Sequence, residues 1–144
     1  MLKTFDELTV YQLYQILKLR SAIFVLEQQC LYQDMDDKDQ QCYHLMIFED
    51  NQLAAYTRLL PAGLSFKEVS IGRVITNQAF RGRGLARKIM QQSIEACYEL
   101  FGKQPIRIGA QLYLKDFYGS LGFIQQGEMY LEDDIPHIEM LLAV

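Results

Sequence analysis

The stretch that decides the fold covers residues 68–101 and reads E-V-S-I-G-R-V-I-T-N-Q-A-F-R-G-R-G-L-A-R-K-I-M-Q-Q-S-I-E-A-C-Y-E-L-F. The residues at the start of this stretch, 68–75, predict a strand. From residue 84 onward, apolar and small side chains recur at helical spacing in two adjacent rows, which predicts a helix over 84–101. The rows consist of Leu85, Ile89, Ser93 and Ala96, and of Ala86, Met90, Ile94 and Cys97. A strand, a glycine-containing turn and a helix therefore follow one another directly.

The flanking sequence predicts a sheet that is mainly antiparallel. Thr9 and Gln12 have the spacing of a capping box, at the start of a helix that we expect over 10–28. Further strands are expected at 44–48, 53–60, 105–110, 123–130 and 137–142, with a short helix at 112–121. The central strand–helix–strand unit implies one parallel pair. We therefore predict one domain, residues 1–144, of the α/β (α+β mixed) class: a mixed, mostly antiparallel twisted sheet with one central parallel strand pair and helices on both faces.

The composition excludes several classes of protein. With 144 residues, half of them apolar, the chain is long enough to bury one core. The net charge of −4 argues against a nucleic-acid or acidic-lipid partner. No window approaches the roughly 18 apolar residues of a membrane span, and no signal-peptide-like run is found. Since three cysteines are too few for a disulfide scaffold, we expect a cytoplasmic protein.

The turn at 81–84, Arg-Gly-Arg-Gly, is a candidate anion site. A helix start exposes free backbone N–H groups that attract phosphate, and Gly82 and Gly84 leave room for close approach. Positive charge comes from Arg81, Arg83, Arg87 and Lys88. These residues alone leave a second interpretation open, namely a glycine turn beside a solvated basic helix end.

Two known phosphate motifs do not match this turn. Leu85 and Ala86 replace the Lys-Ser/Thr of a P-loop, and Arg87 replaces the third glycine of the dinucleotide fingerprint. The turn does fit the pattern Arg/Gln-x-x-Gly-x-Gly/Ala over 81–86. It thereby resembles the acyl-CoA loop of the GNAT acetyltransferase superfamily, whose second landmark resembles residues 117–123, F-Y-G-S-L-G-F.

Within that superfamily the chain resembles the ElaA-type proteins over essentially its whole length. The matching segments are Gln12-Leu13-Tyr14 with Leu19-Arg20, Phe24-Val25 with Glu27-Gln28, Cys30 with Tyr32 and Asp34-x-Asp36, Ile71-Gly72-Arg73-Val74, Gly109-Ala110-Gln111, and Glu132-Asp133-x-Ile135-Pro136-His137-Ile138. The resemblance implies a GNAT-like sheet and an N-acetyltransferase that uses acetyl-CoA and no metal. It further implies direct transfer of the acetyl group to a primary amine of a small molecule or peptide.

The same resemblance implies a set of CoA-binding residues. Backbone N–H groups of 81–87 would hold the pyrophosphate, and Val74 and Ile75 would run along the pantetheine arm. The implied residues are Val74, Ile75, Arg81, Gly82, Arg83, Gly84, Leu85, Ala86, Arg87 and Gln111. Two positions depart from the pattern: Gln111 stands where many relatives carry asparagine, and Tyr113 where ElaA-type sequences often carry histidine.

The resemblance also implies catalytic residues, each with a structural alternative. Tyr118 matches a tyrosine that protonates the leaving CoA thiolate, and its alternative is a core tyrosine. His137 would act as base or orient the acceptor, and its alternative is a structural histidine with one satisfied nitrogen. Glu27 and Glu132 are carboxylate candidates for the base, with ordinary exposed glutamates as the alternative.

Other polar clusters point to weaker hypotheses. An acidic run, Asp34, Asp36, Asp37 and Asp39, would either attract a cationic amine or form a solvated loop. Cys30, Cys42 and His44 lack the regular spacing and the fourth ligand of a zinc site, so we expect no metal. Two other functions stay open: a non-catalytic CoA-binding or sensing domain, and an RNA-interaction module, which the net charge disfavours. The sequence leaves the oligomeric state open, with a homodimer as one alternative.

Overall fold

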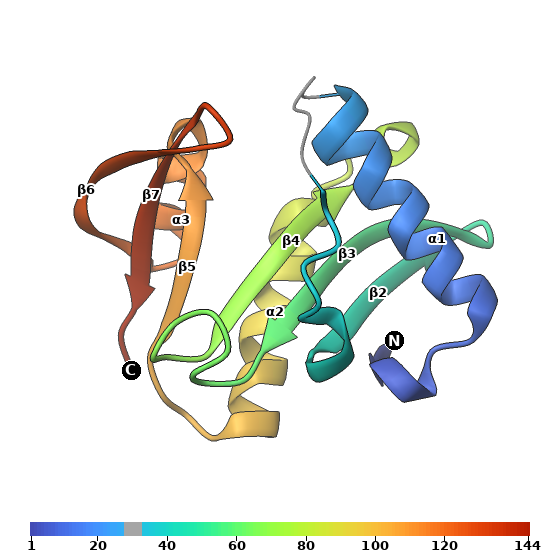
Figure 1. Cartoon of the computed structure of the whole chain (residues 1–144), viewed down its shortest axis with the longest axis horizontal. Coiled ribbons are helices and arrows are strands. Elements are labelled where there is room, and N and C mark those ends of the chain that lie inside the picture. The colour runs from blue at the N-terminus through green and yellow to red at the C-terminus, as the bar shows by residue number, and fades with distance from the viewer. Residues whose placement is uncertain (28–32) are drawn as a thin grey trace.

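The structure is a computed structural model that describes residues 1–27 and 33–144, with Leu26 and Glu27 described by their backbone alone (Figure 1). Its strands are β1 (Leu2–Thr4), β2 (Tyr43–Glu49), β3 (Gln52–Leu60), β4 (Ser70–Thr76), β5 (Ile106–Gln111), β6 (Ile124–Glu132) and β7 (Ile135–Leu142). Its helices are α1 (Val10–Arg20), α2 (Leu85–Phe101) and α3 (Lys115–Ser120). None of the helices in the described residues is both long and apolar enough to cross a membrane.

The strands form two antiparallel sheets, in the orders β1-β2-β3-β4 and β5-β7-β6. One parallel bridge, between Val69 and Ile106, joins them, and the Arg107 N–H donates to the Val69 carbonyl at 3.0 Å. From this bridge β4 and β5 run in the same direction and diverge (Figure 1). The predicted central parallel pair is therefore reduced to a single bridge, while the mixed, mainly antiparallel fold class is confirmed.

A β-bulge explains why β4 leaves its neighbour. Arg58 on β3 pairs with Gly72 and Tyr56 pairs with Ile75, so two residues of β4, Arg73 and Val74, lie opposite one residue of β3. Arg73 has a backbone φ of 50°, in the left-handed region that residues with a Cβ seldom adopt. Such a bulge bends its strand and increases its twist. The edge of β4 thereby opens instead of pairing with β5.

Helices cover both faces of the larger sheet, as predicted. Of the eight residues in the predicted rows of α2, six are buried, while Ala86 and Ile94 are half-buried. On this face Leu85 and Ile89 pack with Leu45 and Ala54. On the other face, Ile16 of α1 packs with residues of β2, β3 and β4. Because β3 lies between these two layers, its residues from Leu53 to Leu60 are all buried. This rigid centre supports β4, whose outer edge faces the opening.

The largest differences from prediction concern the first helix, the segment 112–121 and the edge strand β1, while the other elements differ by at most two residues at either end. The first helix is α-helical over Val10–Arg20 and continues as a π-helix over Ser21–Glu27, instead of one helix over 10–28. The segment predicted as a helix over 112–121 begins with a 3₁₀ turn at Leu112–Leu114 before α3. The short edge strand β1 has too few residues to give a periodic pattern.

Candidate active site

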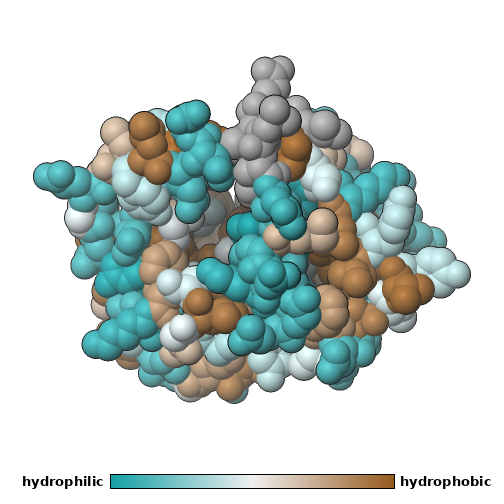
Figure 2. Space-filling model, viewed as in Figure 1, coloured by the Kyte–Doolittle hydropathy of each residue, from teal (hydrophilic) through white to brown (hydrophobic). Residues whose placement is uncertain are grey.

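A cavity of about 1190 Å³ fills the space between the diverging strands. Its walls are the edge of β4, the edge of β5, the β6–β7 hairpin, the start of α2 and the segment 113–118. Residues of two loops also line it: Gln33, Asp36 and Lys38 before β2, and Ser65 and Phe66 before β4. Hydrophilic side chains stand on both sides of the hollow on this face (Figure 2). The divergence of the two strands therefore produces this cavity.

The edge of β4 offers unpaired backbone groups to this cavity. Among the strands of residues 1–27 and 33–144, none pairs with the outer edge of β4 beyond the bridge at Val69. Val74 is half-buried and Ile75 is buried, and both line the cavity. Free N–H and C=O groups on a strand edge are ready partners for an extended ligand.

The start of α2 lies at the cavity and is open to ligands. Gly84 is the N-cap, has φ 72°, and supplies no side-chain cap, so the N–H groups of the first turn lack that partner. No atom lies within 4 Å of the position that a Cβ would take at Gly82 or Gly84. Arg81 and Ala86 line the cavity directly, whereas Leu85 is buried in the core.

Two of the predicted arginines are held by other parts of the protein. Arg83 pairs with Glu49 at 2.9 Å and lies over the Phe80 ring. Arg87 donates to the Ser120 hydroxyl at 2.8 Å and lies over the Phe117 ring, linking α2 to α3. Both side chains thus fix the shape of the loop while adding positive charge around it.

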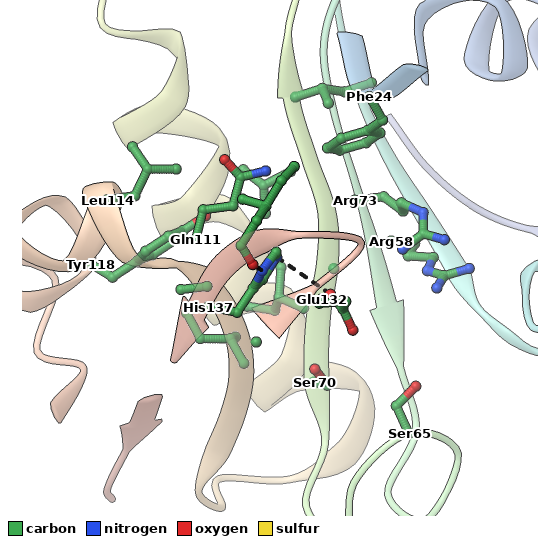
Figure 3. A pocket seen from close by; sticks show the side chains of 18 of the residues that line it. Phe24, Arg58, Ser65, Ser70, Arg73, Gln111, Leu114, Tyr118, Glu132 and His137 are labelled. Carbon is green, nitrogen blue, oxygen red and sulfur yellow. Dashed lines mark hydrogen bonds and ion pairs between the residues drawn. The ribbon is translucent and has the colours of Figure 1, made fainter. Parts of the chain in front are cut away.

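Tyr118 on α3 lines the cavity from the side of α2 (Figure 3). The side chain is buried and makes edge-on contacts with the rings of Phe117 and Phe123. Burial raises the pKa of its hydroxyl to about 12, with a smaller contribution from Tyr113. The hydroxyl is therefore protonated at neutral pH and can donate a hydrogen bond to an anion in the cavity.

His137 on β7 lines the same cavity and is held by three contacts. Its Nδ1 lies 2.7 Å from the carbonyl oxygen of Ile135, so this nitrogen carries a proton and donates it. Its Nε2 lies 3.3 Å from a carboxylate oxygen of Glu132 (Figure 3). The ring stacks on Tyr130, with centroids 5.9 Å apart. In the neutral ring Nε2 carries the lone pair, and Glu132 can stabilise a proton that this nitrogen takes up.

The structure brings most of the predicted site residues to this one cavity. Val74, Ile75, Arg81, Ala86, Gln111, Tyr118 and His137 all line it. Glu132 and Tyr113, named as a base candidate and as a departure from the family pattern, line it as well. Glu27 ends the π-helix, but its side chain is outside the described part of the chain, and Cys30 lies outside the described residues altogether.

Three of the four aspartates in the acidic run at 34–39 are paired with arginines. The run is therefore neither an anionic surface that attracts an amine nor a solvated loop, and both interpretations given above are corrected. Asp34 and Asp39 are buried, and Asp36 is half-buried. Their partners are three arginines from distant parts of the sequence. Arg20 pairs with Asp34 at 2.7 Å and with Asp39 at 2.8 Å. Arg58 pairs with Asp36 at 2.5 Å and with Asp39 at 2.9 Å. Arg73 pairs with Asp34 at 2.8 Å. We call these six residues the ionic cluster.

A signal for this cluster was present in the sequence. Arg58 interrupts an apolar run in a strand that is buried on both faces, and a charge in such a position needs partners. Its Nε is the buried side-chain polar atom in the described residues without a hydrogen-bond partner. The partners themselves lie 19 and 22 positions away and could not be assigned from spacing.

His44 joins the ionic cluster to the sheet. Its Nε2 donates to the Asp39 carbonyl at 2.9 Å, so its Nδ1 accepts the hydroxyl proton of Tyr56 at 2.6 Å. Burial lowers the pKa of His44, outweighing the opposite effect of the Asp39 carbonyl. Burial alone would raise the pKa of Asp39, but hydrogen bonds from Arg20 and Arg58 outweigh it and lower that pKa.

These shifts predict that the protein loses stability on acidification in two steps. A histidine with a depressed folded pKa contributes stability that is lost as the pH falls below its ordinary value of 6.5. A carboxyl with a depressed pKa adds a second loss below its ordinary value of 3.8. We expect urea unfolding at pH 7.5 and pH 5.5 to show the first step in the native chain, with a slope of at most about 1.4 kcal/mol per pH unit for one group.

The variant His44→Gln tests whether the first step comes from His44 or from the second histidine in the chain, His137. The variant should be less stable at pH 7.5 and should lose less stability than the native chain between pH 7.5 and 5.5. An unchanged pH dependence in the variant would assign the first step to another group.

The described part of the chain offers no set of ligands for a metal ion. No group of three or more His, Cys, Asp or Glu side chains there is arranged to hold a metal ion. Cys42 is buried, its thiol lies 3.1 Å from the Lys38 carbonyl, and burial raises its pKa to about 11.

Comparisons with known proteins agree with this architecture. The family model "Acetyltransferase (GNAT) domain" matches residues 10–144. Protein ElaA of Escherichia coli K12 is 43% identical over 141 residues, which cover 96% of this chain and 92% of ElaA. The crystal structure of Escherichia coli ElaA aligns with a TM-score of 0.91 at 40% identity, covering 98% of this chain and 96% of that one. An acyl-CoA N-acyltransferase from Pseudomonas aeruginosa is 42% identical, with a TM-score of 0.94 and coverage of 99% and 97%.

A more distant structure shares the fold alone. An aminoglycoside 6'-N-acetyltransferase complexed with coenzyme A aligns with a TM-score of 0.73 at 14% identity, covering 99% of this chain and 96% of that one.

Proposed function

Because the chain belongs to the GNAT acetyltransferase family, we propose that it transfers an acetyl group from acetyl-CoA to a primary amine, and that residues 1–144 form one acyltransferase domain. The observation that carries this proposal is the meeting of two features at one cavity: the open start of α2 and the unpaired edge of β4. The acceptor is the amine of a small molecule or peptide.

The residues at this cavity fit the chemistry of CoA. A pyrophosphate needs several N–H donors and room for close approach, which the first turn of α2 and the loop at Gly82 and Gly84 offer. Arg81 adds positive charge at the cavity wall. The pantetheine arm carries amides along an extended chain, and the free edge of β4 at Val74 and Ile75 suits such a chain. Gln111 on β5 faces the same space.

Acetyl-CoA supplies a thioester with an electrophilic carbonyl carbon and a thiolate leaving group. A backbone N–H near Val74 and Ile75 donates to the oxygen on which negative charge develops. His137 Nε2, supported by Glu132, takes the proton that the amine loses as its nitrogen bonds to the carbon. The hydroxyl of Tyr118 donates to the sulfur as the carbon–sulfur bond breaks. Both reactants are held in one cavity, so positioning contributes a large part of the rate.

If CoA binds at the start of α2, Gly84→Ala should weaken CoA binding, and Gly63→Ala is the matched control. Gly84 and Gly63 both have left-handed φ, 72° and 87°, with open space around the Cβ position. Each alanine substitution should cost about 1–2 kcal/mol of stability for the same reason. Only Gly84→Ala puts a methyl group where the pyrophosphate would approach, so it alone should raise the Kd for CoA, by roughly 10-fold or more.

Calorimetric titration with CoA measures this difference, and thermal unfolding of both variants checks that their strain is equal. Equal affinities in the two variants would remove the pyrophosphate from the start of α2 and leave the basic turn as a surface feature.

A further inference from the structure

We propose that the acceptor carries a carboxylate as well as its amine, and that Arg73 and Lys38 bind this carboxylate on the side of the cavity that the loops before β2 and β4 line. This rests on the transferase function proposed above and names the chemical class of its second substrate. A free amino acid or a short peptide with a free carboxyl end belongs to this class.

Arg73 presents a fixed guanidinium edge to the cavity. Its Nε and Nη2 donate to the carboxylate and the carbonyl of Asp34, both at 2.8 Å, and the guanidinium lies over the Phe24 ring. Its Nη1 makes no hydrogen bond within the described residues, and a fifth of the side chain, 21%, is exposed. The side chain lines the cavity beside Arg58 (Figure 3). One edge of the guanidinium is thus held in place while the other is free to bind a ligand oxygen.

Backbone geometry adds an independent reason to expect function at Arg73. The residue keeps a left-handed φ of 50° at the bulge of β4, where glycine would be unstrained. Strain of this kind is costly, and such residues cluster at functional sites. The bulge both opens the cavity and turns the arginine into its wall.

Lys38 adds a second donor group to the cavity wall, and Asp36 connects it to Arg73: the Asp36 carboxylate lies 3.6 Å from Arg73 Nη2 and accepts a hydrogen bond from the Lys38 N–H at 3.2 Å. Its Nζ donates to the Ser65 hydroxyl at 2.8 Å, and within the described part of the chain no carboxylate lies within ion-pair distance of it. Because Ser65 accepts this bond, its own proton is available to a ligand. Lys38 and Ser65 both line the cavity. Arginine and lysine offer donors only, and the Ser65 hydroxyl adds one more donor, which favours a ligand group made of acceptors, such as a carboxylate.

The charges around the cavity are divided between its two sides. In the ionic cluster three arginines balance three aspartates. Lys38 lines the cavity, whereas the exposed Asp37 beside it in the sequence does not, so on this side the charge of Lys38 is the one outside the cluster that is turned to the cavity. The β6–β7 hairpin contributes the carboxylates Glu132, Asp133 and Glu139 to the other side, next to His137, and Glu139 is paired with Arg107 at 3.1 Å. An ammonium is favoured near the hairpin and a carboxylate near Arg73 and Lys38, which matches a zwitterionic acceptor.

The experiment compares carboxylates with their carboxamides. A panel of amino acids and dipeptides, each paired with its C-terminal amide, is titrated calorimetrically into the CoA-saturated protein, and CoA thiol release is followed with acetyl-CoA. At least one carboxylate should bind roughly 10- to 100-fold more tightly than its amide, and its kcat/KM should be higher by a similar factor.

Two variants connect this preference to the proposed residues. Lys38→Met should reduce the preference at least tenfold and leave the binding of the amide within about twofold. Lys67→Met removes an equal charge from an exposed residue close to Ser65 that does not line the cavity, and it should keep the preference. Thermal unfolding of both variants shows that they remain folded.

Two results would overturn the proposal. One is a panel in which no carboxylate binds more tightly than its amide; the other is a preference that Lys38→Met leaves intact. Thiol release with simple amines in either case would keep the transferase function while rejecting a carboxylate-bearing acceptor. Because the binding arm needs no turnover, a tight carboxylate without thiol release would reject the transferase function alone.

Discussion

Tyr118→Phe is expected to lower kcat about 100- to 1000-fold while the Kd for CoA stays within about twofold. The proposed role of Tyr118 is to donate a hydrogen bond to the sulfur as negative charge develops there, which is a contribution made in the transition state and not in CoA binding. Removing one oxygen from a buried ring leaves its contacts with Phe117 and Phe123 in place. The fall should therefore appear equally in kcat and in kcat/KM for the acceptor.

The control for this variant is Tyr98→Phe, which removes the same hydroxyl from a partly buried tyrosine on α2 that does not line the cavity. Its turnover should match that of the native protein. The pKa of about 12 at Tyr118 keeps the hydroxyl protonated over the whole range used for kinetics, so the native rate should show no decline from its ionisation below about pH 10. Near-normal turnover of Tyr118→Phe would reduce Tyr118 to a core tyrosine.

Arg20→Ala is expected to cost about 3–5 kcal/mol of stability, which for a chain of this size lowers Tm on the order of 10 °C. Arg20 is 1% exposed and binds Asp34 and Asp39, both buried, so the substitution removes one cation partner from each of two buried carboxylates, which keep their bonds to Arg73 and Arg58. The cost comes from the negative charge that is then left uncompensated in the buried cluster, since a buried pair contributes less when compared with apolar residues of the same size.

The matched control is Lys18→Ala, two positions earlier on α1, where the cation is exposed. Its effect should stay within about 0.5 kcal/mol. Raising the proton concentration offers a second check, because protonated aspartates no longer need the arginine. The difference in stability between Arg20→Ala and the native chain should therefore shrink below about pH 4. A constant difference at all pH values would assign the loss to packing of the arginine stem.

Local pattern was enough to predict the centre of the fold. The two apolar rows of 84–101 predicted α2 to within one residue, because this helix buries one broad face against a sheet. The glycines at 82 and 84 correctly marked the turn before it, where the backbone adopts left-handed φ. The hairpin of β2 and β3 also followed from two apolar runs around a turn signal.

Other features depend on contacts between distant residues and could not be predicted in this way. The bulge at Arg73 is set by the register between β3 and β4, and it decides that β4 and β5 diverge after one bridge. The acidic run looked like a surface loop because its arginine partners lie on α1, β3 and β4. The change from α- to π-helix after Arg20 alters the hydrogen-bond spacing without a sequence signal as plain as proline or glycine.

The candidate site was predictable where backbone chemistry defines it and less so where side chains do. The resemblance to GNAT proteins rested on the loop at 81–86 and on residues 117–123, and both border the cavity. His137 and Glu132 were named separately, and the register of β6 and β7 brings them within 3.3 Å of each other. Lys38 and Arg73 had no local signal of function, since their place in the cavity depends on a loop and a bulge.

The most direct test of the central claim is a single mixture of the purified protein, acetyl-CoA and a library of primary amines, including amino acids, analysed for CoA thiol and by mass spectrometry. We predict that thiol and one N-acetylated amine accumulate in equal amounts, and that the protein mass stays unchanged when the amine is omitted. Tight binding of acetyl-CoA without release of thiol for any amine would contradict this account and make the chain a CoA-binding domain. An acetylated protein in the absence of amine would contradict direct transfer.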